Sequence, residues 1–285
     1  MNEPLLEVSL SAGYGKRTII QDLQFTLVAG ERLGLVGTSG AGKSTLLLAL
    51  LGLLPWRNGW TKGEVRLQGV NLLGLKEREA RRLRGKAVAL VPQSPTSALN
   101  SALSLQTHFQ EAWRAHEPAN RLRLGTRTEE LLRRVNLPSD PAFLKRKPGE
   151  ISVGQAQRCA LALALLHRPA LVIADEPTSA LDPSTQVEVL KLLREITRDE
   201  DASILFVSHD LLSVLRLCTR IAVLHGGTIA ECLATADIAQ TQHPALRDLL
   251  RTLPAPPAVL LRYLAEESWA VTTPLLSEEL LTLPC

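Results

Sequence analysis

Short apolar segments of strand length alternate with longer segments of helical periodicity along most of the chain. The segments at 171–174 and 203–207 are almost entirely apolar, which is typical of strands buried on both faces of a sheet. Two further segments, at 221–224 and 228–231, flank a Gly-Gly pair and predict a hairpin. We expect a parallel α/β fold. The other strand-like segments are 5–10, 24–28, 32–36, 64–68 and 87–91.

The alternation stops between about residues 92 and 168, where helical periodicity replaces it. Prolines divide this stretch, so we expect several short helices with loops between them. The pattern changes again after about residue 233, where further prolines interrupt short amphipathic segments. The sequence therefore predicts a helical insertion in an α/β core and a small C-terminal extension. The prolines are Pro138, Pro141 and Pro148 in the first stretch and Pro254, Pro256, Pro257 and Pro274 in the second.

The composition is that of an ordinary folded protein. The chain has 285 residues, of which 45% are hydrophobic and 21% charged. Its net charge of +3 is too small to indicate a nucleic-acid partner. No apolar run approaches the roughly 20 residues of a membrane helix, and no signal peptide is evident at the start. The four cysteines lack C-x-x-C spacing, which favours structural thiols in a reducing compartment.

Residues 37–44 read GTSGAGKS, which matches the phosphate-loop pattern G-x-x-x-x-G-K-[ST]. A strand-like segment at 32–36 precedes the loop and a helix-like segment at 44–54 follows it, as a nucleotide site requires. Glycines allow the backbone to curl around phosphate oxygens, and the lysine and serine reach the phosphates and Mg²⁺. The sequence therefore predicts a nucleoside triphosphate site. Its residues are Gly37, Thr38, Ser39, Gly40, Ala41, Gly42, Lys43, Ser44 and Thr45.

Two carboxylates follow the apolar strand at 171–174. Asp175 stands at the end of the strand, where we expect it to hold Mg²⁺ directly or through water. Glu176 is the next residue, where a carboxylate can polarise an attacking water. Adjacent acids also occur in solvated turns, but the upstream phosphate loop favours the catalytic interpretation.

Residues 151–158 read ISVGQAQR and open a helix-like segment about twenty residues before the two carboxylates. With this segment, the chain resembles the nucleotide-binding subunits of ATP-binding cassette (ABC) transporters, whose signature is LSGGQ followed by x-Q-R. The resemblance covers about residues 5–232, and the motifs occur in the family's order. It implies a P-loop NTPase (RecA-like) core sheet with an N-terminal antiparallel β region. It also implies a nucleotide-binding domain at 1–232, a helical subdomain at about 93–168 and an extension at 233–285.

The resemblance also implies roles for residues outside the phosphate loop. Gln93 matches the Q-loop glutamine that contacts Mg²⁺ or water, and Asp182 lies in a segment similar to the D-loop. Tyr14 stands where the family has an aromatic that stacks on adenine. His209 matches the switch histidine at the γ-phosphate, although a lone histidine is more often a packed core residue. The ligands that the resemblance implies are ATP and Mg²⁺. The implied catalytic residues are Glu176, His209 and Lys43, and the implied metal ligands are Ser44, Gln93 and Asp175. Ser152, Gly154 and Gln155 are the implied contacts of the signature with nucleotide.

Val153 departs from the family pattern, because it stands where the signature usually has its first glycine. In the family, this segment caps the γ-phosphate of ATP bound to the opposite subunit. Ser152 and Gly154 remain, but a β-branched residue restricts the backbone and adds bulk beside the nucleotide. We expect the site to which this signature contributes to be weakened, whereas the site at the chain's own phosphate loop is complete.

The resemblance implies a dimer of nucleotide domains that closes on two ATP molecules and drives permease subunits. Residues 94–100, SPTSALN, and the segment at 243–250 are similar to the importer ATPases for peptides, dipeptides and nickel. Partners are then transmembrane permeases, a second identical or homologous ATP-binding subunit and, indirectly, a solute-binding protein. No nucleic acid and no iron–sulfur centre are expected. The implied location is peripheral, on the cytoplasmic face of the inner membrane.

Three alternatives stay open at this point. One is a soluble ABC mechanoenzyme, although only about 110 residues separate the phosphate loop from the signature. That interval leaves no room for a long coiled coil. Another is a weakly hydrolysing regulatory partner in a heterodimer, suggested by Val153 and opposed by the intact Glu176. The third is a GTPase, against which no N-K-x-D motif is found.

Overall fold

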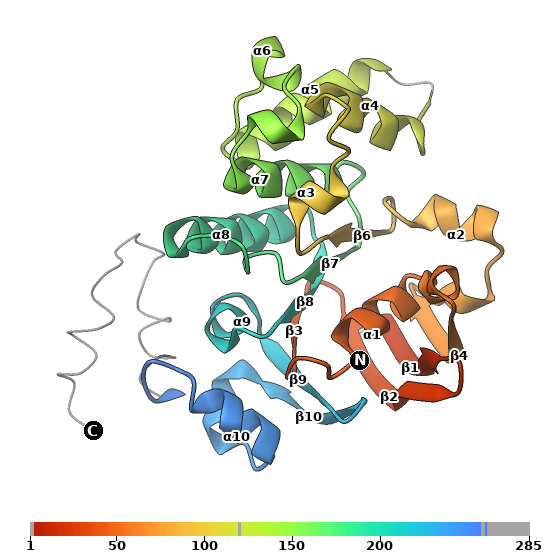
Figure 1. Cartoon of the computed structure of the whole chain (residues 1–285), viewed down its shortest axis with the longest axis vertical. Coiled ribbons are helices and arrows are strands. Elements are labelled where there is room, and N and C mark those ends of the chain that lie inside the picture. Colours follow the sequence, from red (N-terminus) through yellow and green to blue (C-terminus); the bar gives the residue numbers. More distant parts are fainter. Residues whose placement is uncertain (1–2, 119–120, 258–259, 261–285) are drawn as a thin grey trace.

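The computed structural model describes residues 3–118, 121–257 and 260, and two sheets form its centre (Figure 1). The first sheet has the order β2-β1-β4-β5, and each neighbouring pair is antiparallel. The antiparallel region expected near the N-terminus is therefore confirmed. Its strands are β1 (Pro4–Tyr14), β2 (Arg17–Val28), β4 (Gly59–Leu67) and β5 (Val70–Asn71).

The second sheet has the order β10-β9-β3-β8-β7-β6. All of its neighbouring strands are parallel except β10, which is antiparallel to β9. This arrangement confirms the predicted parallel α/β core and the closing hairpin. The strands are β3 (Arg32–Val36), β6 (Val88–Val91), β7 (Leu171–Asp175), β8 (Ser203–Ser208), β9 (Arg220–His225) and β10 (Thr228–Ala234).

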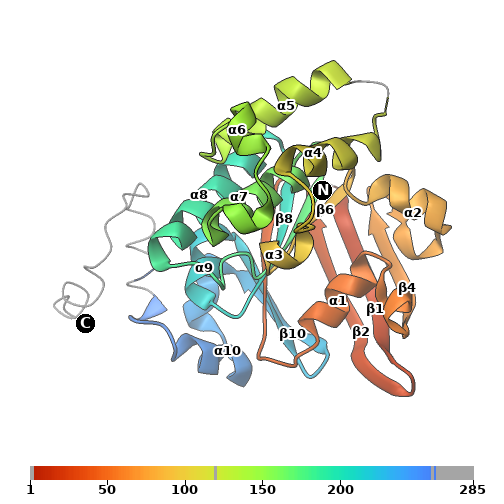
Figure 2. The same cartoon turned by 45° about the horizontal axis from the view of Figure 1, so that its top comes forward.

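Helices cover the core and form a separate group at one end of it (Figure 1 and Figure 2). Helix α1 (Lys43–Leu50) contacts β1, β2, β4 and β7, so it packs between the two sheets. Helices α4 to α7 gather beyond the β6–β7 side of the parallel sheet, where the helical insertion was expected. The remaining helices are α2 (Glu77–Leu83), α3 (Pro95–Ala98), α4 (Leu105–Arg114), α5 (Arg121–Arg134), α6 (Pro141–Leu144), α7 (Val153–Ala164), α8 (Pro183–Asp199), α9 (Leu211–Leu217) and α10 (Pro244–Leu250).

The parallel strands are apolar on both faces because each face packs against a different cluster. In β8, Ile204 and Phe206 join a core with residues of α7, α8 and α9. Leu205 and Val207 point to the opposite face and join a core with α1 and the antiparallel sheet. Alternating side chains thus serve two cores, which explains why the sequence shows no polar alternation in this strand.

The ends of several elements differ from the sequence-based expectation, and the largest differences are at β2 and α1. Strands β1 and β2 extend to Tyr14 and back to Arg17, so the second strand starts well before residue 24. Helix α1 ends at Leu50, and the prediction that it continues to residue 54 was wrong. Gly52 takes a left-handed φ of 63°, and a 3-10 turn at Leu54–Arg57 with Pro55 near its start follows. Both features end an α-helix.

The C-terminal part begins with β10 and continues through a 3-10 segment, Thr235–Gln240, to α10. His243 caps α10, because its Nδ1 accepts a hydrogen bond from the backbone N–H of Ala245 at 3.2 Å. Leu246 of this helix is fully buried and belongs to the core of the parallel sheet. The expected break at Pro274 and the fourth cysteine, Cys285, lie outside the described residues.

A buried carboxylate fixes α5 to the end of α8. The side chain of Glu200 is 5% exposed and lies within 3.3 Å of nitrogens on Arg127, Arg134 and Arg168. We expect Glu200→Gln to lower the free energy of unfolding by about 2–3 kcal/mol, because it leaves the 8% exposed Arg127 without one of its carboxylates. Urea unfolding of the variant and the wild type measures the difference in the free energy of unfolding.

The matched control for this prediction is Glu129→Gln on the same helix, α5. Glu129 is 57% exposed and pairs with Arg133 one turn away. An exposed pair of this kind contributes less than about 1 kcal/mol, so the control should unfold almost as the wild type does. Equal losses in the two variants would contradict the prediction.

Candidate nucleotide-binding site

Four loops that carry predicted site residues meet at one edge of the parallel sheet. They follow β3, β8, β7 and β6, which are consecutive neighbours in the sheet. Since these strands are parallel, their carboxyl ends lie at the same edge, which is where α/β sheets bind ligands. Residues from distant parts of the sequence, Lys43, Gln93, Glu176 and His209, are thereby brought together.

The phosphate loop folds tightly before α1. Gly40 and Gly42 have φ values of 81° and 106°, in the left-handed region that favours glycine. Lys43 is the first residue of α1, and its Nζ donates hydrogen bonds to the carbonyl oxygens of Gly37 at 2.8 Å and Thr38 at 3.3 Å. The ammonium group therefore lies inside the turn that the loop makes, close to the N-terminus of the helix. This is the geometry of an anion-binding loop.

An open hollow of about 720 Å³ lies over this loop. Its volume is within the range of small-molecule sites. Ten of the residues that the sequence predicted line it, among them Tyr14 and Glu176. Arg17 and Ile19 also line it and were not predicted. The full set is Tyr14, Arg17, Ile19, Ser39, Gly40, Gly42, Lys43, Ser44, Thr45, Gln93, Glu176 and His209.

Arg17 and Ile19 were missed because residues 17–23 were not recognised as a strand. Tyr14 pairs with Arg17 across the β1–β2 hairpin, so the start of β2 runs beside the tyrosine. Ile20 and Leu23 are both fully buried and the two residues between them are exposed, so the buried positions do not alternate as in a regular strand. The hairpin turn at residues 15–16 then places the first residues of β2 at the hollow.

Glu176 is the centre of the polar contacts in the hollow. Its Oε2 accepts a hydrogen bond from Gln93 Nε2 at 3.1 Å and lies 3.0 Å from His209 Nδ1. Its Oε1 lies 3.9 Å from Lys43 Nζ. The glutamate backbone has a φ of 43°, which is unusual for a residue other than glycine. Such strain concentrates at functional sites, and here it is held by a 2.8 Å hydrogen bond from Glu176 N to Val207 O.

Asp175 is the last residue of β7, directly before Glu176, and is partly buried. Burial raises the pKa of its carboxyl, the neighbouring Glu176 raises it further, and Lys43 acts in the opposite direction. Ser44, Gln93 and Asp175 offer hydroxyl, amide and carboxylate oxygens at the same sheet edge. Oxygen ligands of these kinds suit Mg²⁺, so the residues fit the ion that the sequence predicted.

The signature residues and Asp182 do not line the hollow. Ser152 caps α7, where its Oγ accepts from Gln155 N at 3.1 Å and Gln155 Oε1 accepts from Ser152 N at 3.0 Å. Asp182 accepts hydrogen bonds from Ser184 and Thr185 at the start of α8, and these bonds lower the pKa of its carboxyl. A side chain at Gly154 would lie 3.1 Å from that same threonine. The two helix starts therefore form a second surface, on which Val153 is 47% exposed.

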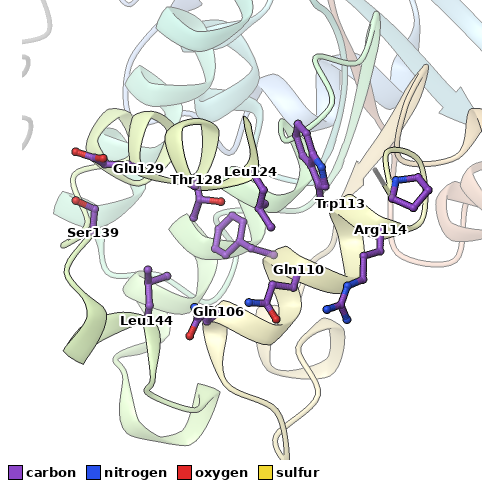
Figure 3. A pocket seen from close by; sticks show the side chains of 12 residues that line it. Gln106, Gln110, Trp113, Arg114, Leu124, Thr128, Glu129, Ser139 and Leu144 are labelled. Carbon is purple, nitrogen blue, oxygen red and sulfur yellow. The ribbon is translucent and has the colours of Figure 1, made fainter. Parts of the chain in front are cut away.

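A further hollow, of about 410 Å³, lies in the helical group between α4 and α5 (Figure 3). Its wall is partly aromatic and aliphatic, with Phe109, Trp113 and Leu144 among the lining residues. Gln106, Gln110 and Glu129 supply polar groups at its margin. None of the predicted site residues lines this hollow, so the candidate nucleotide site is the one at the sheet edge.

The position of Tyr14 makes its contribution to binding testable. We expect Tyr14→Ala to raise the Kd for ATP by about 10-fold, because stacking on a base is worth about 1–3 kcal/mol. Tyr14→Phe keeps the ring and should bind within about twofold of the wild type. Titration with a fluorescent ATP analogue and competition with ATP measures both variants. Equal weakening in the two would show that the hydroxyl, and not the ring, makes the contribution.

The comparisons with known proteins point to the same protein family. A family model described as ABC transporter matches residues 20–179. The oligopeptide transport ATP-binding protein OppD of Escherichia coli (strain K12) is 35% identical over 255 residues, covering 89% of this chain and 75% of that protein. The dipeptide transport ATP-binding protein DppD of Haemophilus influenzae is 36% identical over 256 residues, covering 88% and 78%.

Solved structures show the same likeness. A dimeric ATP-binding cassette in a post-hydrolysis state, bound to ADP and Pi, matches with a TM-score of 0.69 and 25% identity. The match covers 80% of this chain and 98% of that one. The ATP-binding subunit of an ABC transporter matches with a TM-score of 0.69 and 28% identity, covering 92% of this chain and all of the other.

Proposed function

Because the chain belongs to the ABC transporter family, as an ATP-binding subunit that hydrolyses ATP for transport, we propose that it powers a peptide importer. The relatives named above transport oligopeptides and dipeptides, and they match over most of this chain. Their names give no support to nickel, so nickel chelates are not part of the proposal. The observation that carries the proposed mechanism is the convergence of Gln93, His209 and Lys43 on Glu176.

The proposed chemistry follows from the contacts around Glu176. Lys43 and the amides of the phosphate loop bind the polyphosphate, and Tyr14 binds the base. Glu176 accepts the proton of the attacking water, and Gln93 and His209 keep its carboxylate in one orientation. A Mg²⁺ ion held by Ser44, Gln93 and Asp175 would neutralise phosphate charge. His209 Nδ1 lies 3.0 Å from the same carboxylate, so its ring would stand close to a γ-phosphate attacked by the water that Glu176 holds.

We further propose that the site is completed by a second cassette. Ser152, Gly154, Gln155 and Asp182 belong to a surface separate from the chain's own hollow, and the related cassette cited above is dimeric. The partner's signature would cap the nucleotide here, and this chain's signature would cap the partner's. Val153 would weaken the second of these sites, which favours an unlike partner over a second copy. We also propose two domains: a nucleotide-binding domain at 1–232, which includes a helical subdomain at about 93–168, and a C-terminal extension at 233–285.

Two other functions have less support. A soluble mechanoenzyme has no support in the names of the relatives, which describe transport. A regulatory partner that does not hydrolyse ATP would not need the three contacts that orient Glu176. The first reason favours transport and the second favours hydrolysis, so a transport ATPase that hydrolyses ATP has more support than either alternative.

In the part of the chain that the structure describes, no helix is long and apolar enough to cross a membrane. We propose that the chain associates with the cytoplasmic face of the inner membrane through permease subunits, and that a solute-binding protein delivers peptide to them. Nucleic acid has no part in the proposal.

The experiment that tests the function is mass spectrometry of the proteins that co-purify with this chain from detergent-solubilised cells. The proposal expects two integral membrane permeases and a second ATP-binding subunit. Peptide uptake should fall when this chain is deleted and return with the wild-type gene. Recovery of ribosomal or DNA-associated proteins without a membrane protein would contradict the importer.

A further inference from the structure

We propose that Gln186 is a positioning residue for ATP hydrolysis, which holds the turn that carries His209 in place beside Glu176. The inference rests on the proposed roles of these two residues. Gln186 lies in the first turn of α8 and is not one of the residues that line the hollow. It therefore acts on the reaction only through other residues.

The side-chain amide of Gln186 joins three segments of the chain. Its Nε2 donates to Asp210 Oδ2 at 3.0 Å and to Ser213 Oγ at 2.9 Å, and it lies 3.5 Å from Thr178 Oγ1. Asp210 directly follows His209, and Thr178 is two residues beyond Glu176. A single amide thus links the turn after β8 to the turn after β7 and to the start of α8.

Asp210 connects the amide of Gln186 to the backbone beside His209. Its Oδ1 accepts from Leu212 N at 3.0 Å and its Oδ2 from Ser213 N at 3.3 Å, so it caps α9. Ser213 Oγ also donates to Oδ2, and Asp210 N donates to Ser208 Oγ at 3.0 Å. The backbone on both sides of His209 is therefore anchored, while its side chain is 60% exposed. Gln186 is the contact in this set that comes from another helix.

The alternative is that Gln186 only stabilises the packing of α8 against α9. Thr178 and Ser213 are 3% and 2% exposed, so the contacts lie in a buried region where such a role is reasonable. The two interpretations differ in what they predict for hydrolysis. Packing alone would change the unfolding transition, whereas positioning changes kcat and depends on the presence of His209.

The test is a double-mutant cycle between Gln186 and His209 in the full-length chain, assayed in the complex that co-purifies with it. Gln186→Met keeps the length of the side chain and removes its hydrogen bonds. We expect kcat for phosphate release from labelled ATP to fall about 10-fold, because small displacements of a catalytic group have large effects on rate. The KM for ATP should stay within about twofold. In a His209→Ala background, Gln186→Met should change kcat by less than about twofold, since the group it positions is gone.

Three results would overturn the inference. They are an unchanged kcat in Gln186→Met, an equal loss in the wild-type and His209→Ala backgrounds, and a His209→Ala variant with wild-type kcat. The first and second would leave the proposed ATPase mechanism standing, whereas the third would reject the role of His209 itself. Gln24→Met, on an exposed position of β2, is the matched control and should keep wild-type kinetics.

A second variant keeps the inference testable if Gln186→Met does not fold. Ser213→Ala removes one acceptor of the Gln186 amide and one donor to Asp210. It should lower kcat by about threefold to fivefold and show the same loss of effect in the His209→Ala background. An additive effect there would overturn the inference.

Discussion

Replacing Glu176 with glutamine is expected to lower kcat for ATP hydrolysis by at least about 100-fold, while ATP still binds within about threefold of the wild-type Kd. A positioned general base typically contributes a factor of about 10²–10⁴, and an amide cannot accept the proton of the attacking water. The substitution keeps the size of the side chain, so the phosphate loop and Tyr14 should keep their positions. The loss therefore falls on chemistry and not on binding.

Phosphate release and nucleotide titration on the same preparation measure the two effects. Glu129→Gln, the same chemical change at an exposed position on α5, is the control and should hydrolyse ATP normally. Equal phosphate release from Glu176→Gln and the wild type would show that another group accepts the proton. It would also revive the interpretation of this chain as a regulatory partner.

Replacing Lys43 with methionine is expected to raise the Kd for ATP by about 30- to 100-fold. Lys43 Nζ donates to two carbonyl oxygens of the phosphate loop, so it both shapes the loop and supplies its positive charge. A hydrogen bond to a charged group contributes about 1.5–3 kcal/mol, and each 1.4 kcal/mol is a factor of ten in affinity. Methionine preserves the aliphatic stem and removes only the ammonium group.

Isothermal titration with ATP measures this loss. Lys145→Met, at an exposed position next to α6, removes the same charge far from the hollow and should bind ATP as the wild type does. If both variants lost affinity to the same degree, the effect would come from net charge and not from the phosphate loop. Together with Glu176→Gln, this variant separates nucleotide binding from the chemical step.

Local patterns in the sequence were sufficient for most elements of the fold. The strands at 171–174 and 203–207 were identified because apolar residues that serve two cores leave an unbroken apolar run. The start of β2 was not identified, because residues 17–23 mix exposed polar and buried apolar positions and include Asp22 at a φ of 43°. The end of α1 was misplaced because leucines continue beyond Gly52, and hydrophobic periodicity does not register a left-handed glycine.

The residues of the candidate site likewise fall into those that the sequence predicted and those that it did not. The phosphate loop and the pair Asp175–Glu176 were predicted, because their chemistry depends on residues that are neighbours in sequence. Arg17, Ile19 and Gln186 were not, since each reaches the site through contacts between elements that are distant in the chain. No local spacing could indicate that the amide of Gln186 bonds to Asp210, 24 residues further on.

The sequence by itself determined that this protein has a parallel α/β core, a phosphate loop and a carboxylate pair after a buried strand, and it indicated the family. These features follow from backbone geometry and side-chain periodicity over a few residues. Only the tertiary structure decided that Gln93, His209 and Lys43 surround Glu176, and that residues 152–155 do not line the hollow. The order of strands in the sheet decides which loops become neighbours, and that order is fixed by the packing of the whole core.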